Sequence, residues 1–162
     1  MKNKGFSLIE LLITIAIIGV IGTIAFVSLN GVREKARDTK RKNDIAQIGR
    51  FLALSCYEPN GGTGTYDLAD LLEEIKVKFP QAQNFLAKAP RDPKIGTDDQ
   101  TYYFYQYQSS DKKCVLYANL ENQDEPITLI NLSAPTPGGG SGVLQATSNG
   151  PNNTPIYFQY SN

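Results

Sequence analysis

The feature that most constrains this chain is a long uncharged segment near its N-terminus. Between Phe6 and Val32 the only ionisable residue is Glu10, and Leu11 to Leu29 form 19 consecutive uncharged residues. As an α-helix this stretch is roughly 28 Å long, about the thickness of a bilayer's hydrocarbon core. The alternative is a secretory signal peptide, but its apolar run is usually about 7–15 residues and ends at a small-residue cleavage site. The sequence therefore predicts a membrane-spanning helix.

Helical periodicity continues beyond this segment into polar sequence. Residues 33–58 contain one Gly and no Pro, and apolar residues recur there at helical spacing. We therefore expect one helix that runs without a break to about Tyr57 and stops at Glu58 to Gly62. Asp38 and Lys42 are spaced as an i,i+4 ion pair. The apolar stripe of this half comprises Ile45, Ile48, Leu52 and Cys56, widened by Phe51 and Leu54.

The rest of the chain is typical of a small α+β domain. Residues 67–79 predict a short helix with Asp67 as its N-cap. Residues 101–108 and 114–121 predict a β-hairpin. Residues 127–132 predict a third strand, residues 133–155 a loop, and residues 156–160 an edge strand. Together these elements predict a long N-terminal helix packed on a small antiparallel sheet.

Composition excludes several kinds of site. The chain has 16 basic and 16 acidic residues, so its net charge gives no general reason to expect nucleic acid as a partner. It has no His, the commonest general base and metal ligand. We find no catalytic motif and no cluster with metal-ligand spacing, and therefore predict that the chain is not an enzyme and holds no metal or cofactor.

Cys56 and Cys114 are the only cysteines. In an exported domain they could form a disulfide, whose loop of about 58 residues would stabilise the fold by roughly 3–4 kcal/mol on the chain-entropy model. Two small buried apolar side chains are the alternative. The sequence leaves both interpretations open.

A basic cluster directly follows the apolar segment, and residues 33–42 hold six cations against Glu34 and Asp38. Such a cluster favours a cytoplasmic location of the following chain, which conflicts with export. It is either a docking surface for anionic lipid or acidic protein, or a solvated helix face. The six cations are Arg33, Lys35, Arg37, Lys40, Arg41 and Lys42.

The N-terminal motif is more specific. Lys4-Gly5-Phe6 is followed by Ser7-Leu8-Ile9-Glu10 and then the apolar helix. This pattern resembles the type IV prepilin signature. The resemblance implies that a prepilin peptidase cleaves between Gly5 and Phe6 and that Phe6 becomes N-methylated. It also implies that Glu10, a costly carboxylate in an apolar segment, pairs with the positive N-terminus of a neighbouring subunit. Because this motif is more specific than the charge of the basic cluster, we expect the chain after the apolar segment to be exported.

The resemblance extends, less specifically, to about residue 121. Residues 36–57 are similar to the polar half of the pseudopilin helix, and Asn60-Gly61 with Tyr66 resembles a family loop. The Asp-Pro segment at 89–93 and the strand after it are similar to major pseudopilins. Three departures stand out: Val27 replaces the family's usual Pro, the calcium loop is not recognisable in residues 119–125, and the chain after Ser133 has no family counterpart.

These observations predict four parts. Residues 1–5 are a cytoplasmic leader, 6–29 the membrane and filament-core half of the helix, 30–132 the globular domain, and 133–162 a Gly- and Pro-rich tail. The predicted function is a structural subunit of a type IV pilus-like filament, with a type II secretion pseudopilus slightly favoured. The alternatives are an adhesive or competence pilin and a single-pass membrane-anchored binding domain that never polymerises.

The predicted partners follow from this function. They are copies of the chain in a helical filament, prepilin peptidase, the inner-membrane assembly machinery and the lipid bilayer. The basic cluster gives only weak support for DNA as a partner. Before assembly we expect a single-pass membrane protein with a cytoplasmic N-terminus, and afterwards a cell-surface or periplasmic filament.

Overall fold

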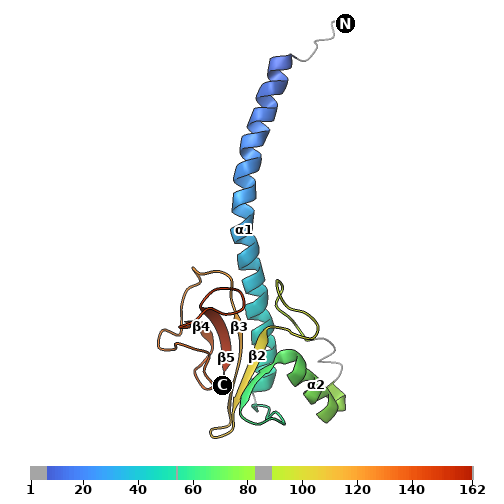
Figure 1. Cartoon of the computed structure of the whole chain (residues 1–162), viewed down its shortest axis with the longest axis vertical. Coiled ribbons are helices and arrows are strands. Elements are labelled where there is room, and N and C mark those ends of the chain that lie inside the picture. The colour runs from blue at the N-terminus through green and yellow to red at the C-terminus, as the bar shows by residue number, and fades with distance from the viewer. Residues whose placement is uncertain (1–6, 54, 83–88, 162) are drawn as a thin grey trace. The chain divides into compact units, whose positions relative to one another are not determined.

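The computed structural model describes residues 7–53, 55–82 and 89–161. The predicted α+β arrangement, a long N-terminal helix with an antiparallel sheet, is confirmed (Figure 1). The chain divides into two compact units, Met1–Glu34 and Lys35–Asn162. The elements, in chain order, are α1 (Leu8–Ala53), β1 (Gly64–Asp67), α2 (Leu68–Lys78), a 3-10 turn (Pro80–Ala82), β2 (Tyr103–Gln108), β3 (Lys113–Asn119), β4 (Gly142–Gln145) and β5 (Ile156–Ser161).

The first unit contains the start of α1, whose described apolar side chains are exposed. Leu8 is 77% exposed and Leu12 52%, and every residue from Leu8 to Ile21 is in the exposed class. A helix that is apolar on all sides lacks the polar face of a surface helix. Among the residues that the structure describes, no helix combines the length and the apolar character needed to cross a membrane.

In the second unit, α1 presents one face to the core. Asp38, Arg41, Ile45, Gly49 and Leu52 are buried, at intervals of three or four residues, which puts them on one side of the helix. Ile48 packs partly buried at the border of this face. Phe51, predicted to widen the stripe, is instead 52% exposed, and Leu54 lies outside the described residues.

The helix ends a turn earlier than predicted, at Ala53 instead of about Tyr57. Ser55 and Cys56 form a turn, and Cys56 has a φ of 27°. Right-handed helices require a negative φ, so the backbone at Cys56 cannot continue α1. The change of direction brings Cys56 into the core beside the sheet.

The sheet has five antiparallel strands in the order β1-β2-β3-β5-β4. The predicted hairpin is confirmed as β2 and β3, with Tyr103 opposite Ala118 and Gln108 opposite Lys113. The face of the sheet that includes Tyr103, Tyr105 and Leu116 packs in the same core cluster as the buried side of α1 and four buried residues of α2. Those four are Leu68, Leu71, Leu72 and Ile75.

Three strand predictions were wrong. Residues 127–132 form no strand, because the N–H groups of Thr128 and Leu129 both donate to the single carbonyl of Val143, whereas a ladder uses alternate residues. β4 forms inside the predicted loop, and β1 was not predicted. The strand at 156–161 is not at an edge, because β5 pairs with both β3 and β4.

The prediction for α2 is confirmed, including its cap. Asp67 precedes the helix in extended conformation, and its Oδ1 accepts from the N–H of Ala69 at 2.9 Å. This is the geometry of an N-cap carboxylate.

Candidate functional site

The first turn of α1 carries Glu10, the residue predicted to act in assembly. Its Oε2 accepts a hydrogen bond from the backbone N–H of Ser7 at 3.0 Å. The Ser7 carbonyl in turn accepts from the N–H groups of Glu10 and Leu11 at 3.1 and 3.3 Å. Glu10 therefore reaches back to the cap residue as the glutamate of a capping box does. The positive end of the helix dipole stabilises a carboxylate at this position.

Gly5 and Phe6 lie outside the described residues, so cleavage between them and methylation of Phe6 stay predictions. Pairing of Glu10 with a neighbouring subunit also stays a prediction. The Glu10 side chain is exposed, and a carboxylate has about four acceptor sites. Its bond to Ser7 therefore leaves capacity for a further donor.

The described surface that follows Glu10 is almost entirely apolar, and the hydroxyls of Thr14 and Thr23 donate to the backbone carbonyls of Leu11 and Val20. The large apolar side chains from Leu8 to Ile21 are each more than half exposed. Contiguous apolar surfaces of this kind mark sites of association with protein or lipid. The described part of the motif thus combines one carboxylate with an association surface.

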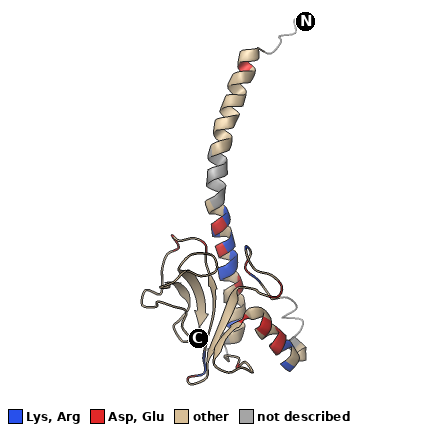
Figure 2. Cartoon of the chain, viewed as in Figure 1, with Lys and Arg blue, Asp and Glu red and all other residues tan. Residues whose placement is uncertain are grey.

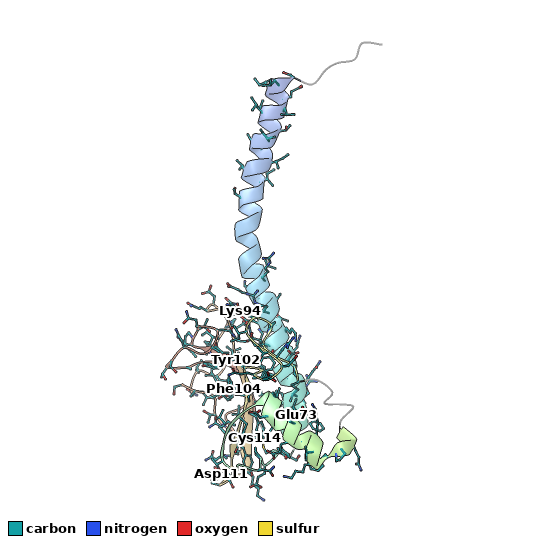
Figure 3. All side chains as sticks on the ribbon, turned by 45° about the vertical axis from the view of Figure 1, so that its right-hand side comes forward. Glu73, Lys94, Tyr102, Phe104, Asp111 and Cys114 are labelled. Carbon is teal, nitrogen blue, oxygen red and sulfur yellow. A yellow bond between two sulfur atoms is a disulfide. The ribbon has the colours of Figure 1, made fainter. Side chains whose placement is uncertain are left out.

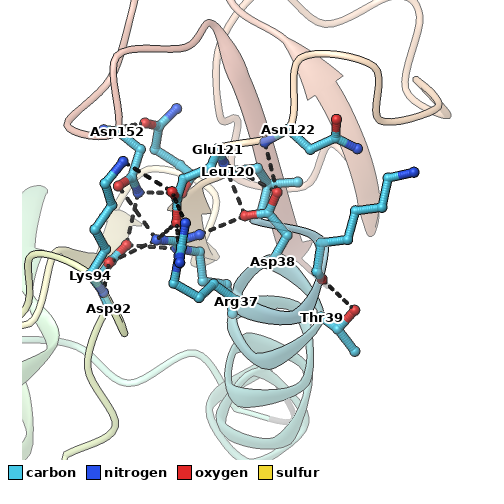
Figure 4. Close-up of polar contacts among 12 residues, drawn as sticks. Arg37, Asp38, Thr39, Asp92, Lys94, Leu120, Glu121, Asn122 and Asn152 are labelled. Atoms are coloured by element: carbon cyan, nitrogen blue, oxygen red, sulfur yellow. Dashed lines mark hydrogen bonds and ion pairs between the residues drawn. The ribbon is translucent and has the colours of Figure 1, made fainter. Parts of the chain in front are cut away.

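A second polar constellation lies in the other unit, where Arg41 is fully buried among three carboxylates. Figure 4 labels these carboxylates, which belong to Asp38, Asp92 and Glu121. Arg41 Nη1 donates to Asp38 at 2.6 Å, its Nε to Asp92 at 2.7 Å, and its Nη2 contacts Glu121 at 2.7 Å. Nη2 also donates to Asp92 Oδ1 at 2.9 Å. A buried guanidinium is tolerated only when its charge is neutralised and its N–H groups are bonded.

Further cations balance the negative charge of this network. Arg37 donates through Nε and Nη2 to the two oxygens of Glu121 at 2.7 and 2.6 Å. Lys94 contacts Glu121 Oε2 at 3.0 Å, and Asn152 donates to Asp92 at 2.8 Å. The network, which we call the Arg41 network, ties α1 to the segments that carry Asp92, Glu121 and Asn152. Its members are Arg37, Asp38, Arg41, Asp92, Lys94, Glu121 and Asn152.

The network shifts the acidity of its carboxyl groups. Burial alone would raise the pKa of Glu121, but hydrogen bonds from Arg37, Lys94 and Arg41 lower it to about 2. Burial also opposes ionisation of Asp92, whose pKa is lowered by Arg41, Asn152 and the backbone N–H of Lys94. Burial would lower the pKa of Arg41, but its carboxylate partners raise it instead. All three groups are therefore charged at neutral pH.

The basic cluster is thus neither a uniform docking surface nor a uniformly solvated face. Arg41 is buried, Arg37 bonds to Glu121, and Lys42 pairs with Glu125. Asp38 has Arg41 and the backbone N–H groups of residues 121 and 122 as partners, in place of the expected pair with Lys42. Three of the six cations therefore point inward and stabilise the fold.

Cys56 and Cys114 are joined by a disulfide in the structure, with a Cα–Cα distance of 5.5 Å. Cys114 is the second residue of β3, close to the hairpin turn that contains Asp111 (Figure 3). The bridge links the turn after α1 to the centre of the sheet. Both sulfur-bearing residues belong to the main core cluster.

Two acidic residues of segment 119–125, in which the sequence shows no recognisable calcium loop, have protein partners in the structure. Asn119 donates to Thr154 and Ile156, Glu121 belongs to the Arg41 network, and Glu125 pairs with Lys42. Over the described ranges, no three His, Cys, Asp or Glu residues are grouped as metal ligands. The absence of a metal remains a prediction.

Sequence reasoning missed the second role of Asp67. Besides capping α2, its carboxylate accepts from the N–H and hydroxyl of Thr101 at 3.0 and 2.7 Å and from the N–H of Tyr102 at 3.1 Å. These bonds hold Tyr102 at a φ of 59°, a conformation that is uncommon for a bulky residue. The cap had a sequence signal, whereas a contact across 34 residues has none.

Comparisons with known proteins bear on the N-terminal motif and on the chain as a whole. Residues 1–26 match the family model described as the prokaryotic N-terminal methylation motif. The type II secretion system core protein G of Escherichia coli (strain K12) is 29% identical over 97 residues, which cover 57% of this chain and 67% of that protein.

Two further relatives carry the same description. The protein of Pectobacterium carotovorum is 29% identical over 104 residues, 61% of this chain and 66% of the relative. That of Aeromonas hydrophila is 25% identical over 97 residues, 57% of this chain and 68% of the relative. The matched regions thus span about two thirds of each relative. No solved structure matches the chain.

Proposed function

We propose that this chain, which the N-terminal motif and its relatives identify as similar to type IV pilins and pseudopilins, is a structural subunit of a pseudopilus-type filament. The resemblance predicted from residues 4–29 is confirmed by both comparisons. The observation that carries the proposal is the match to the methylation motif at residues 1–26, which includes the start of α1, where the large apolar side chains from Leu8 to Ile21 are exposed.

The role of the helix follows from burial of its apolar side chains. The subunit would wait in the membrane through residues 6–29 and then exchange lipid for the helices of other copies. Burial of apolar surface contributes about 25 cal/mol per Å². Transfer of a helix that is apolar on all sides out of water is therefore strongly favourable, both into lipid and into a bundle of neighbouring helices. Head-to-tail contacts that do not close generate a filament.

Glu10 would distinguish the two environments. Beside lipid heads it has water and the Ser7 N–H as partners. Inside a filament an unpaired carboxylate would be costly, and a neighbour's N-terminal amine would neutralise it. The role would therefore be structural, with Glu10 setting register and no catalytic step involved.

The disulfide supports an exported globular unit. Disulfides persist in oxidising compartments such as the periplasm and are rare in the cytosol. A bridge between Cys56 and Cys114 thus supports the periplasmic side for residues after the apolar segment. The inward-facing Arg37, Arg41 and Lys42 also reduce the charge that this side would present to the membrane.

The proposal is tested by processing. Coexpression with a prepilin peptidase should shorten the chain by five residues and leave Phe6 at the new N-terminus, as read by intact-mass spectrometry. Gly5→Leu should block the cut and serves as the control. An unprocessed wild-type chain in the presence of active peptidase would sink the proposal.

Assembly is tested separately with Glu10→Ala. The variant should be processed and retained in membranes, but it should be absent from filaments sheared from cells that carry the assembly machinery. Glu34→Ala, at a second acidic position of the same helix, is the matched control. Normal filament yield from Glu10→Ala would defeat the pairing role, and a processed chain that never leaves the membrane would favour the non-polymerising anchor.

A further inference from the structure

The face of α1 that points away from the core is largely exposed among the residues that the structure describes. From Lys35 to Leu52 the exposed residues include three cations and no carboxylate. Asp38 is buried, and Asp44, which is partly buried, bonds to Lys40 and Tyr103. We call this surface the basic face. Its exposed residues are Lys35, Ala36, Thr39, Lys40, Asn43, Gln47, Arg50 and Phe51.

The same unit carries a surface of opposite charge. A groove of about 480 Å³ lies between α2 and the loop before β2, and four carboxylates line it. Glu73 pairs with Lys76 and Asp98 pairs with Arg91, so the negative charge that the groove offers a partner comes from Asp70 and Asp99. Figure 2 shows blue residues with some red along the charged part of α1, and mainly red residues with some blue along α2. We call this groove the acidic groove. Its carboxylates are Asp70, Glu73, Asp98 and Asp99.

We propose that the basic face of one copy docks on the acidic groove of the next copy in the filament. This inference rests on the proposed function. The chain as a whole is uncharged, with 16 basic and 16 acidic residues, so copies do not repel one another. Because the two surfaces are different patches of one chain, each copy uses one and leaves the other open, which extends a polymer without closing it.

The distribution of the cations favours a protein partner over lipid. Lys35 and Arg50 are 15 residues apart, which is roughly 22 Å along a helix. A helix that leaves the bilayer would carry Arg50 well beyond the Debye length of about 8 Å over which anionic lipid heads attract charge. A second helical subunit alongside can contact the whole face.

The contact would fix register more than it holds the filament together. Exposed ion pairs contribute little each and are screened by salt, whereas complementary patches direct encounter and exclude wrong arrangements. The apolar helices would supply the main association energy, and the charged surfaces would select one lateral placement of the subunits.

A charge-exchange experiment tests the contact in cells that assemble the full chain. Variant one carries Lys35→Glu and Arg50→Glu, variant two carries Asp70→Lys and Asp99→Lys, and variant three carries all four changes. The matched control reverses two exposed cations of the hairpin turn, Lys112→Glu and Lys113→Glu. The measurement is the yield of sheared filaments per total subunit, with the Cys56–Cys114 bridge monitored on non-reducing gels as a check of folding.

Variants one and two should each lose roughly tenfold in yield, as expected for like charges facing each other at an interface. Variant three should recover most of it, and the control should match wild type. Neutral versions should give smaller losses of filament yield, and they test the contact if a charge-reversed variant fails to fold. They are Lys35→Gln with Arg50→Gln, and Asp70→Asn with Asp99→Asn.

The outcomes separate this contact from the proposed function. If variants one and two give the same filament yield as the wild type, the contact is overturned and the proposed function stands. The same holds if the filament yield of variant three is no higher than that of variants one and two. If variant one is no longer retained in membranes while variant two forms normal filaments, the basic face binds lipid and the contact is overturned. Failure of the wild type to form filaments with its assembly machinery would overturn both proposals.

Discussion

At the scale of single residues, charge is used in two opposite ways along α1. Arg41 is 0% exposed and joins three carboxylates, whereas Lys35 lies on the exposed side of the same helix. Six positions separate them, and the difference comes from where the helix meets the segments carrying Asp92 and Glu121. Cationic side chains therefore serve as core and as surface within two turns of the same helix.

Replacing Arg41 by Met should lower the free energy of unfolding by about 3–5 kcal/mol, because removing one partner leaves buried carboxylates without a counter-charge. Chemical denaturation of the purified residue 35–162 unit, or of the full chain in detergent, measures the change. Lys35→Met is the control, with an expected change within about 0.5 kcal/mol. Equal stability of the two variants would contradict a stabilising role for the network.

The same residues make stability depend on acid pH. The pKa of Glu121 falls to about 2 in the folded chain, from an ordinary value of 4.5, and that of Asp92 is also lowered. Since both groups bind protons more tightly when unfolded, stability is fully present above about pH 4.5 and is lost as the pH falls toward 2. Denaturation midpoints at pH 7, 4 and 2.5 should decrease in that order, and a flat profile would be evidence against the network.

At the scale of elements, the disulfide is the one covalent link between α1's C-terminal turn and the sheet. It joins Cys56 to Cys114 in β3 across 58 residues of sequence. Gly49 lies in the last turns of α1 on its buried face, and a Cβ there would come within 2.6 Å of the Tyr160 ring on β5. The end of the helix therefore approaches β3 through a bridge and β5 through the absence of a side chain.

Replacing Cys56 and Cys114 together by Ala should destabilise the domain by about 3–4 kcal/mol, the entropy of closing a loop of this length. Thermal unfolding of the double variant beside the oxidised wild type gives the difference. The wild type in reductant should approach the variant. If reduction and substitution both leave the midpoint unchanged, the bridge does not stabilise the fold.

At the scale of the whole molecule, residues beyond 133 belong to the sheet and are not an appendage. β5 lies between β3 and β4, and Tyr160 and Phe158 pack against the main core. Asn152, on the loop between β4 and β5, bonds to Asp92 in the Arg41 network. The C-terminal part of the chain therefore completes both the core and the polar network.

Truncation after Ser133 should accordingly leave no stable globular unit. The loss of β5 exposes one edge of β3 and uncovers part of the core, and an unpaired edge of this kind promotes aggregation. Limited proteolysis should degrade the truncated chain under conditions where the full chain resists. A protease-resistant fragment spanning residues 35–133 would show that the extra strands are dispensable.

The sequence predicted most of the local structure and the position of the motif. Helical periodicity identified α1 and α2, the cap signal identified Asp67, and β-prone runs identified β2 and β3. It failed at β1 and β4, which are four residues each, because such short strands exist only through pairing with a neighbour. It also failed at residues 127–132, whose apolar composition suits a strand, but the N–H groups of Thr128 and Leu129 share the carbonyl of Val143 and do not form a ladder.

Sequence patterns were enough to recognise the apolar N-terminal helix, the methylation motif with Glu10 and the likeness to pilins, because these depend on residues adjacent in the chain. The folded structure was needed to show which cations are buried, that β5 is interior and that the two cysteines meet. Those features depend on segments tens of residues apart, and their energies arise only when the fold removes the side chains from water.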